Sequence, residues 1–174
     1  RANTTGKCNV AIGALSLTSN TTGFYNTGVG YQALTTNTFG LCNTGLGYRA
    51  LASNTTGNHN TAVGLIALQA NTIGSNNTAV GYFSLVSNTT GVDNIAIGSS
   101  SLRTNTSGID NTAVGVNALY NNINGKCNVA IGKNALHNTT TGIDNVAVGR
   151  SAMYNNVSGI GNVAIGKFAA TQTK

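Results

Sequence analysis

The sequence predicts an all-β parallel β-solenoid, a rod built from ten 17-residue coils. Three observations predict it: the residues repeat with a fixed period of 17, two glycines recur in every unit, and short β-branched or small apolar segments lie between them. A helical-hairpin repeat needs about 30 residues or more. A single long amphipathic helix does not carry glycine twice in every unit.

The repeat fills residues 3–172 without an insertion, and its units begin at residues 3, 20, 37, 54, 71, 88, 105, 122, 139 and 156. We number the positions within each unit from 1 to 17. Position 1 is Asn in nine units and Thr139 in the remaining one, position 7 is always Asn, and positions 4 and 11 are always Gly. Residues 1–174 are therefore expected to form a single repeat domain. Because solenoids need capping units to stay soluble and neither end has an obvious one, we expect a segment of a longer chain.

Each coil is expected to contain two short strands joined by two tight turns. The first candidate strand covers positions 7–11, as in Asn60–Gly64, and the second runs from position 14 to position 2 of the next unit. The glycines at positions 4 and 11 then occupy the corners, where a positive φ or a close backbone approach is required. Coils that stack at about 4.8 Å make a rod of roughly 48 Å and allow the Asn columns to form amide ladders.

The apolar residues leave two arrangements of the interior open. Position 9 is always Ala or Gly, position 14 is always Ala or Ser, position 10 is always Val, Ile or Leu, and position 15 is Leu in eight units. Neighbouring strand residues point to opposite faces. Either positions 10 and 15 fill the coil and a monomer suffices, or positions 9 and 14 fill a thin interior and positions 8 and 10 form an exposed stripe. The second arrangement requires partners, for which a closed homotrimer is the natural solution.

Several segments carry a resemblance to a known family. The segments NVAIG (9–13), NTAVG (60–64) and NIAIG (94–98) resemble the head repeats of trimeric autotransporter adhesins of the YadA-like type, and similar repeats occur in phage and algal-virus fibre proteins. The resemblance covers residues 3–172, although the usual head repeat of the family is shorter than 17 residues. It implies a left-handed β-roll that trimerises, with the Ala column in a narrow interior and the Val/Ile column at the trimer centre. That column comprises Ile12, Val29, Leu46, Val63, Val80, Ile97, Val114, Ile131, Val148 and Ile165.

No group of residues predicts catalysis, a metal site or a cofactor. His59 and His137 are four to five coils apart, the chain contains no Glu, and no nucleophile–His–acid set can converge. Asp93, Asp110 and Asp144 stand at position 6 without the nonapeptide of calcium-binding β-rolls. We therefore predict a protein that is not an enzyme and that binds neither cofactor nor metal.

The three cysteines, Cys8, Cys42 and Cys127, also stand at position 6. Even Cys8 and Cys42 are two coils apart, which exceeds the ~7 Å between Cα atoms that a disulfide can bridge. We expect free, partly buried thiols, with a disulfide between chains as the alternative.

The distribution of charged and of apolar residues excludes two classes of partner. Nine Lys and Arg residues against three Asp residues produce a net charge of +6, but no basic run resembles a nucleic-acid-binding arm. No apolar run approaches the ~20 residues needed to cross a bilayer. Neither nucleic-acid binding nor membrane insertion is predicted for this segment.

The variable positions 12 and 13 carry the candidate binding surface. Coils 2–5 place aromatic and apolar residues there, and coils 8–10 place basic residues at position 12. Exposed Tyr and Arg are typical binding anchors, so these columns form either a surface that contacts a receptor or glycan, or a seam between protomers with ordinary solubilising charge. The candidate residues are Tyr31, Tyr48, Arg49, Ile66, Tyr82, Phe83, Lys133, Arg150 and Lys167.

The sequence as a whole predicts a non-catalytic surface fibre or adhesin head segment that attaches to a host surface or matrix. Its expected partners are copies of itself, as a homotrimer or end to end, and a host-surface protein or glycan. Its expected location is extracellular, at a cell or virion surface. Two alternatives stay open: a purely structural stalk or filament-forming segment, and an ice-binding β-solenoid, because Thr occupies position 2 in eight of the ten units.

Overall fold

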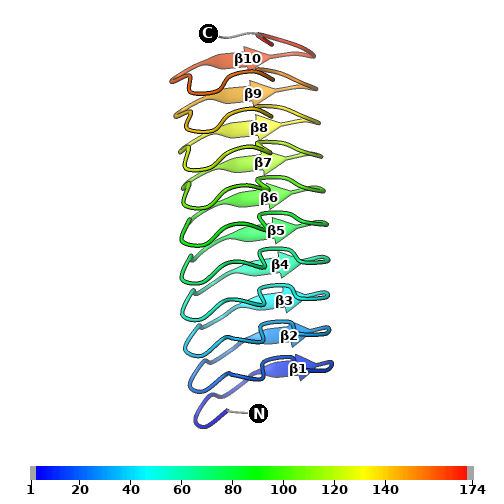
Figure 1. Ribbon diagram of the computed structural model, residues 1–174, viewed down its shortest axis with the longest axis vertical. Coiled ribbons are helices and arrows are strands. Elements are labelled where there is room, and N and C mark those ends of the chain that lie inside the picture. Colours follow the sequence, from blue (N-terminus) through cyan, green and yellow to red (C-terminus); the bar gives the residue numbers. More distant parts are fainter. Residues whose placement is uncertain (1–2, 172–174) are drawn as a thin grey trace.

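The computed structural model describes residues 3–171, which form a rod of stacked coils with the first and last coils at opposite ends of the rod (Figure 1). Each coil contributes one three-residue strand, and the ten strands form a single parallel sheet in sequence order. Each strand pairs in register with the next, so that Ala62 lies opposite Ala79. The strands are β1 (Val10–Ile12), β2 (Thr27–Val29), β3 (Thr44–Leu46), β4 (Thr61–Val63), β5 (Thr78–Val80), β6 (Ile95–Ile97), β7 (Thr112–Val114), β8 (Val129–Ile131), β9 (Val146–Val148) and β10 (Val163–Ile165).

The predicted parallel β-solenoid of 17-residue coils is confirmed. Within residues 3–171 no helix is long and apolar enough to cross a membrane. Residues 1–2 and 172–174, which the predicted domain and its last coil include, lie outside the described residues.

The second strand expected in each coil is not confirmed, because positions 12–17 form consecutive turns. Positions 13 and 15 adopt left-handed backbone conformations, with φ of 56° at Phe83 and 51° at Leu85 in coil 5. Hydrogen bonds between coils nevertheless continue here: the Leu85 N–H donates to the Ser101 carbonyl at 2.9 Å, and the Phe83 N–H donates to the Leu65 carbonyl at 3.2 Å. A left-handed residue costs about 1–3 kcal/mol, and complete burial of the leucine offsets a cost of that size.

The interior combines parts of both expected arrangements. Ala79, Ser84 and Leu85, at positions 9, 14 and 15 of coil 5, are fully buried, whereas position 10 points outward. The prediction that position 10 fills the coil is wrong, because strand alternation sends only position 9 inward. The side chain at position 15 points into the interior from the turn. Leu17, at position 15 of coil 1, packs against Gly28, at position 9 of coil 2, because a Cβ added at Gly28 would lie 3.3 Å from Leu17 Cγ. Position 9 must therefore be small, since the leucine of the preceding coil packs directly against it.

The two invariant glycines serve the corners for different reasons, as expected. Gly64, at position 11, has a φ of +135°, and an added Cβ would lie 2.5 Å from the Gly81 carbonyl oxygen. Gly57, at position 4, has no such φ, but an added Cβ would collide with the Gly74 carbonyl oxygen and with the Asn54 side chain. Position 11 requires a conformation that only glycine adopts readily, and position 4 requires close approach.

Two buried columns of asparagine hold the coils together, which confirms the predicted amide ladders. At position 1, each Nδ2 donates to the Oδ1 of the Asn one coil earlier, at 2.7–3.0 Å from Asn3 to Asn122. At position 7, the Oδ1 accepts the backbone N–H of the next coil: the Asn77 N–H donates to Asn60 Oδ1 at 3.0 Å. The Asn60 Nδ2 donates in turn to the Gly74 carbonyl at 2.8 Å. Among the described residues, the buried polar side chains are therefore paired with the exception of Asn122 Oδ1.

Candidate interaction surface

The repeat converts every outward-pointing position into a column that runs along the rod. We define the strand face as the columns of positions 8 and 10, and the corner face as the columns of positions 12, 13, 16 and 17. The two faces differ in chemistry, because position 10 is always aliphatic whereas positions 12, 13 and 16 vary from coil to coil.

The strand face is an exposed stripe of β-branched and aliphatic side chains. The exposed fraction is 60% at Ile12, 41% at Ile97 and 72% at Ile165, and Leu46 and Ile131 are also exposed. The remaining five members of the column expected at a trimer centre are half-buried: Val29, Val63, Val80, Val114 and Val148. All ten residues therefore lie on the outside of the chain, on one face.

In coils 2–5 the corner face is aromatic and apolar. Tyr31 and Tyr48 stack with ring centroids 5.5 Å apart, and Tyr82 meets Phe83 edge to face at 4.2 Å. The three tyrosines are exposed, and Phe83 is half-buried. The other two candidate residues of this section, Arg49 and Ile66, are also half-buried. The structure thus brings these candidates together in adjoining columns.

In coils 8–10 the same face is basic. Lys133, Arg150 and Lys167 are exposed and follow one another in consecutive coils. The Arg150 guanidinium lies 5.0 Å from the Phe168 ring centroid, and Lys167 Nζ lies 5.1 Å from it. These cation–π contacts orient two of the three cations. All three Asp residues of the chain stand at position 6, outside the corner face.

An aromatic column at position 16, which is not among the residues predicted from the sequence, also lies on the corner face. Tyr120 stacks on His137 with centroids 5.1 Å apart, and His137 stacks on Tyr154 at 4.9 Å, with the ring planes 4° and 10° from parallel. The Arg103 guanidinium extends the column, lying 5.6 Å from the Tyr120 centroid and 4.8 Å from that of Phe83. The spacing of 17 residues between these side chains is a sequence signal for the column, because a coil rise of about 4.8 Å brings equal positions of neighbouring coils to stacking distance.

Asparagine columns flank the aromatic column. At position 17, Asn121 Nδ2 donates to Asn138 Oδ1 at 3.0 Å, and Asn138 Nδ2 donates to Asn155 Oδ1 at 2.8 Å. At position 13, Asn117 Nδ2 donates to Asn134 Oδ1 at 3.2 Å. Coils 7–9 therefore present amides and aromatic rings side by side.

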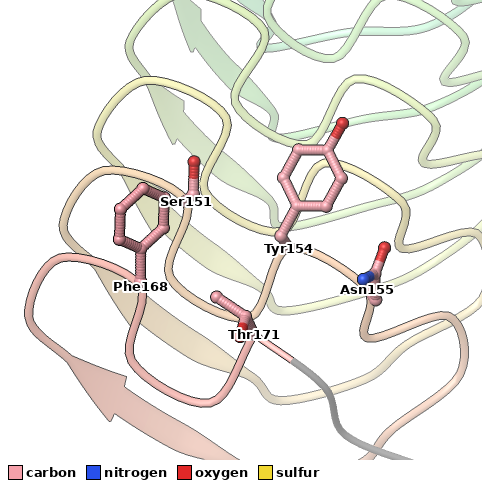
Figure 2. A pocket seen from close by; sticks show the side chains of 5 residues that line it. All are labelled: Ser151, Tyr154, Asn155, Phe168 and Thr171. Carbon is pink, nitrogen blue, oxygen red and sulfur yellow. The ribbon is translucent and has the colours of Figure 1, made fainter.

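A hollow of about 290 Å³ opens on the corner face between coils 9 and 10. Figure 2 shows the rings of Tyr154 and Phe168 on opposite sides, with Ser151 and Thr171 between them and Asn155 beside Tyr154. The aromatic column ends here because the next residue at position 16 is Thr171.

The column of position 6 lies outside this surface and holds the cysteines. Cys8, Cys42 and Cys127 are free, as expected, but they are exposed, so the expected partial burial is wrong. Desolvation raises the pKa of the Cys127 thiol above its ordinary value, and the carboxylates of Asp144 and Asp110 raise it further. The thiol form of Cys127 is therefore favoured, which makes it a poor nucleophile.

The two histidines, His59 and His137, lie in different columns. His59 stands in the position 6 column, whereas His137 stands in the aromatic column. Among residues 3–171 no three His, Cys, Asp or Glu side chains are grouped to hold a metal ion.

The threonines of position 2 use their hydroxyls within the rod. Thr72 Oγ1 donates to the Thr89 carbonyl at 3.0 Å, and Thr55 Oγ1 donates to the Thr72 carbonyl at 2.9 Å. The same bond recurs at Thr21, Thr38 and Thr89. These hydroxyls therefore do not form a column of unused donors.

No protein-family model matches the chain, and no curated protein or solved structure matches it significantly. Its own structure establishes the chain as a parallel β-solenoid repeat protein.

Proposed function

We propose that this chain is a rigid, non-catalytic segment of an extracellular fibre at a cell or virion surface. It assembles with further copies through the strand face and attaches to a host surface or matrix through the corner face. The observation that carries the proposal is the aliphatic column that points outward on the strand face from β1 to β10, with every member exposed or half-buried.

A stripe of this kind calls for a partner. Monomeric proteins rarely expose a contiguous apolar patch larger than a few hundred Å². Three parallel copies around an axis along the rod would bring the same position of every coil to the centre, so that one contact repeats down the interface. A homotrimer of left-handed β-rolls, as in the adhesin heads that the repeats resemble, has this geometry.

The molar mass in solution tests the assembly, measured by light scattering behind a sizing column. We expect three times the chain mass of 17.6 kDa. Ile97→Glu places a charge in the middle of the strand face and should produce a monomer. The matched control Thr90→Glu adds the same charge at an exposed residue of the same coil, outside both faces, and should stay trimeric. A monomeric wild-type chain at all concentrations would refute the trimer, and a polydisperse high mass would indicate end-to-end filaments.

Attachment is tested separately, by binding of the wild-type chain to immobilised matrix proteins and to a glycan array. A trimer that binds none of them would favour the structural stalk, for which the amide ladders supply stiffness. The ice-binding alternative has less support, because the position 2 hydroxyls already donate to carbonyls.

A further inference from the structure

We propose that the corner face of coils 7–10 binds a linear acidic polysaccharide that lies along the rod and carries one anionic group per sugar. The inference rests on the proposed attachment function and names the ligand class and the site.

The spacing of the cations is the first argument. Lys133, Arg150 and Lys167 occupy position 12 of three consecutive coils, and equal positions are separated by about 4.8 Å. This is close to the length of one pyranose unit in a linear chain. A polysaccharide parallel to the rod that carries one anionic group per sugar therefore brings a row of carboxylates or sulfates within reach of the row of long cationic side chains. No Asp stands on the same face to neutralise them.

The amide columns are the second argument. An Asn side chain has two donor hydrogens and an acceptor oxygen with two lone pairs. The bonds along the position 17 column use only part of this capacity: Asn138 Nδ2 donates one of its two hydrogens to Asn155 Oδ1. Amides with spare donors and acceptors match the hydroxyl groups of a sugar.

Contacts between the columns place these groups on one continuous face. Phe168, at position 13, contacts Arg150 at position 12 and also lines the hollow with Tyr154 and Asn155. The same adjacency holds in coils 5 and 6, where Phe83 contacts both Tyr82 and Arg103. A chain bound to the cations therefore passes beside the hollow.

The hollow is the third argument. Its volume of about 290 Å³ is sufficient for one sugar ring, and its walls combine two aromatic rings with the polar side chains of Ser151 and Asn155 (Figure 2). Aromatic rings pack against the C–H faces of sugars, while hydroxyl and amide groups bind sugar hydroxyls. Ligand sites in general combine apolar walls with a few polar groups in this way.

Single-stranded nucleic acid, the other linear polyanion, fits less well. Its binding sites offer exposed aromatic faces on which bases stack. Both faces of the His137 ring are covered by Tyr120 and Tyr154, and Tyr120 lies between His137 and Arg103. The column therefore offers ring edges along most of its length.

The experiment measures binding of a hexamer of β-1,4-linked uronic acid to the full chain by calorimetry at 0.15 M salt. We expect saturable binding and no binding of a neutral β-1,4-linked glucose hexamer. The triple variant Lys133→Gln, Arg150→Gln, Lys167→Gln is expected to bind roughly tenfold more weakly, since each exposed ion pair contributes modestly. The control variant Lys7→Gln, Asn124→Asp, Lys126→Gln lowers the net charge by the same amount at positions outside the corner face and should bind like wild type. Circular dichroism verifies the fold of every variant.

Three outcomes would overturn the inference: equal weakening by the two triple variants, equal binding of the neutral hexamer, or tighter binding of a single-stranded oligonucleotide. Tyr154→Ala tests the hollow and should also weaken binding, with Tyr25→Ala, at an exposed residue outside the corner face, as its control. If the trimer forms and adheres to matrix while the uronate hexamer fails to bind, only this inference fails. If the hexamer binds to a chain that stays monomeric, the trimeric assembly fails and the site stands.

Discussion

The position 1 ladder is interrupted at one place, and repairing it should stabilise the rod. The ladder runs without a break from Asn3 to Asn122, but the next coil carries Thr139, which has no amide. Asn122 Oδ1 is consequently buried without a hydrogen-bond partner among the described residues. Thr139 is itself fully buried, and its Oγ1 donates to the Asn156 carbonyl at 2.6 Å. Thr139→Asn would continue the column.

The magnitude follows from the bonds gained and lost. The new Nδ2 can donate to Asn122 Oδ1 and to the Gly142 carbonyl, as its counterpart Asn122 does one coil earlier with Asn105 and Gly125. Pairing a buried orphan acceptor recovers about 1–3 kcal/mol, and the lost hydroxyl bond is worth about 1 kcal/mol. We expect the free energy of unfolding to rise by about 1–2 kcal/mol.

Hydrogen exchange is the appropriate assay, because a solenoid unfolds in parts and a single global stability is poorly defined for it. Two amides report on the junction: the Ile123 N–H donates to the Thr140 carbonyl, and the Thr140 N–H donates to the Val157 carbonyl, both at 2.9 Å. A gain of 1–2 kcal/mol slows exchange through local opening by roughly 5- to 30-fold. Exchange in coils 1–4 should not change.

Two control variants separate the amide from the loss of the hydroxyl. Thr139→Ser keeps a hydroxyl and should exchange nearly like wild type, whereas Thr139→Ala removes a hydrogen bond and should exchange faster at Thr140. The reasoning is refuted if Thr139→Asn exchanges as fast as wild type or faster, because the orphan oxygen would then carry no cost.

Four further substitutions test the corner, the interior and the cysteine. Gly64→Ala should lower the free energy of local unfolding by more than about 2 kcal/mol, since φ is +135° and the new Cβ would lie 2.5 Å from the Gly81 carbonyl oxygen. Hydrogen exchange at the Gly81 amide, which donates to the Val63 carbonyl, should become faster, and an unchanged rate would contradict this. Leu85→Ala should cost about 2–5 kcal/mol because the side chain is fully buried, whereas Leu85→Met should cost less than about 1.5 kcal/mol. Asp144→Asn removes a carboxylate that, together with desolvation, raises the pKa of Cys127. The pH profile of alkylation at Cys127 should therefore shift to lower pH. An unchanged profile would show that the charge of Asp144 has no effect on the thiol.

Much of the rod could be predicted because identical positions stack on one another. The period of 17 and the invariant Asn and Gly positions were sufficient for the parallel solenoid and its ladders. The aromatic column was predictable by the same comparison, since Tyr120, His137 and Tyr154 are 17 residues apart. The aromatic column is less evident than the ladders because position 16 changes residue type from coil to coil, whereas the Asn and Gly columns keep one type in at least nine of the ten units.

The direction of each side chain could not be predicted in the same way. Leu85 reaches the interior from a left-handed backbone conformation, which a leucine rarely adopts and no sequence pattern signals. The turn that results replaces the second strand expected in each coil. Alternation along the strand was readable, but it could not decide which side of the strand faced the interior.

The sequence by itself determined the coil, the parallel register and the buried amide columns, because a strict repeat brings like residues into contact whatever the shape of the coil. Only the tertiary structure decided that the Val/Ile column lies outside, that position 15 lies inside, and that the basic and aromatic columns adjoin the same hollow. These features depend on the path of the chain around one coil, which is set by backbone conformations and packing between sequence-distant positions of that coil.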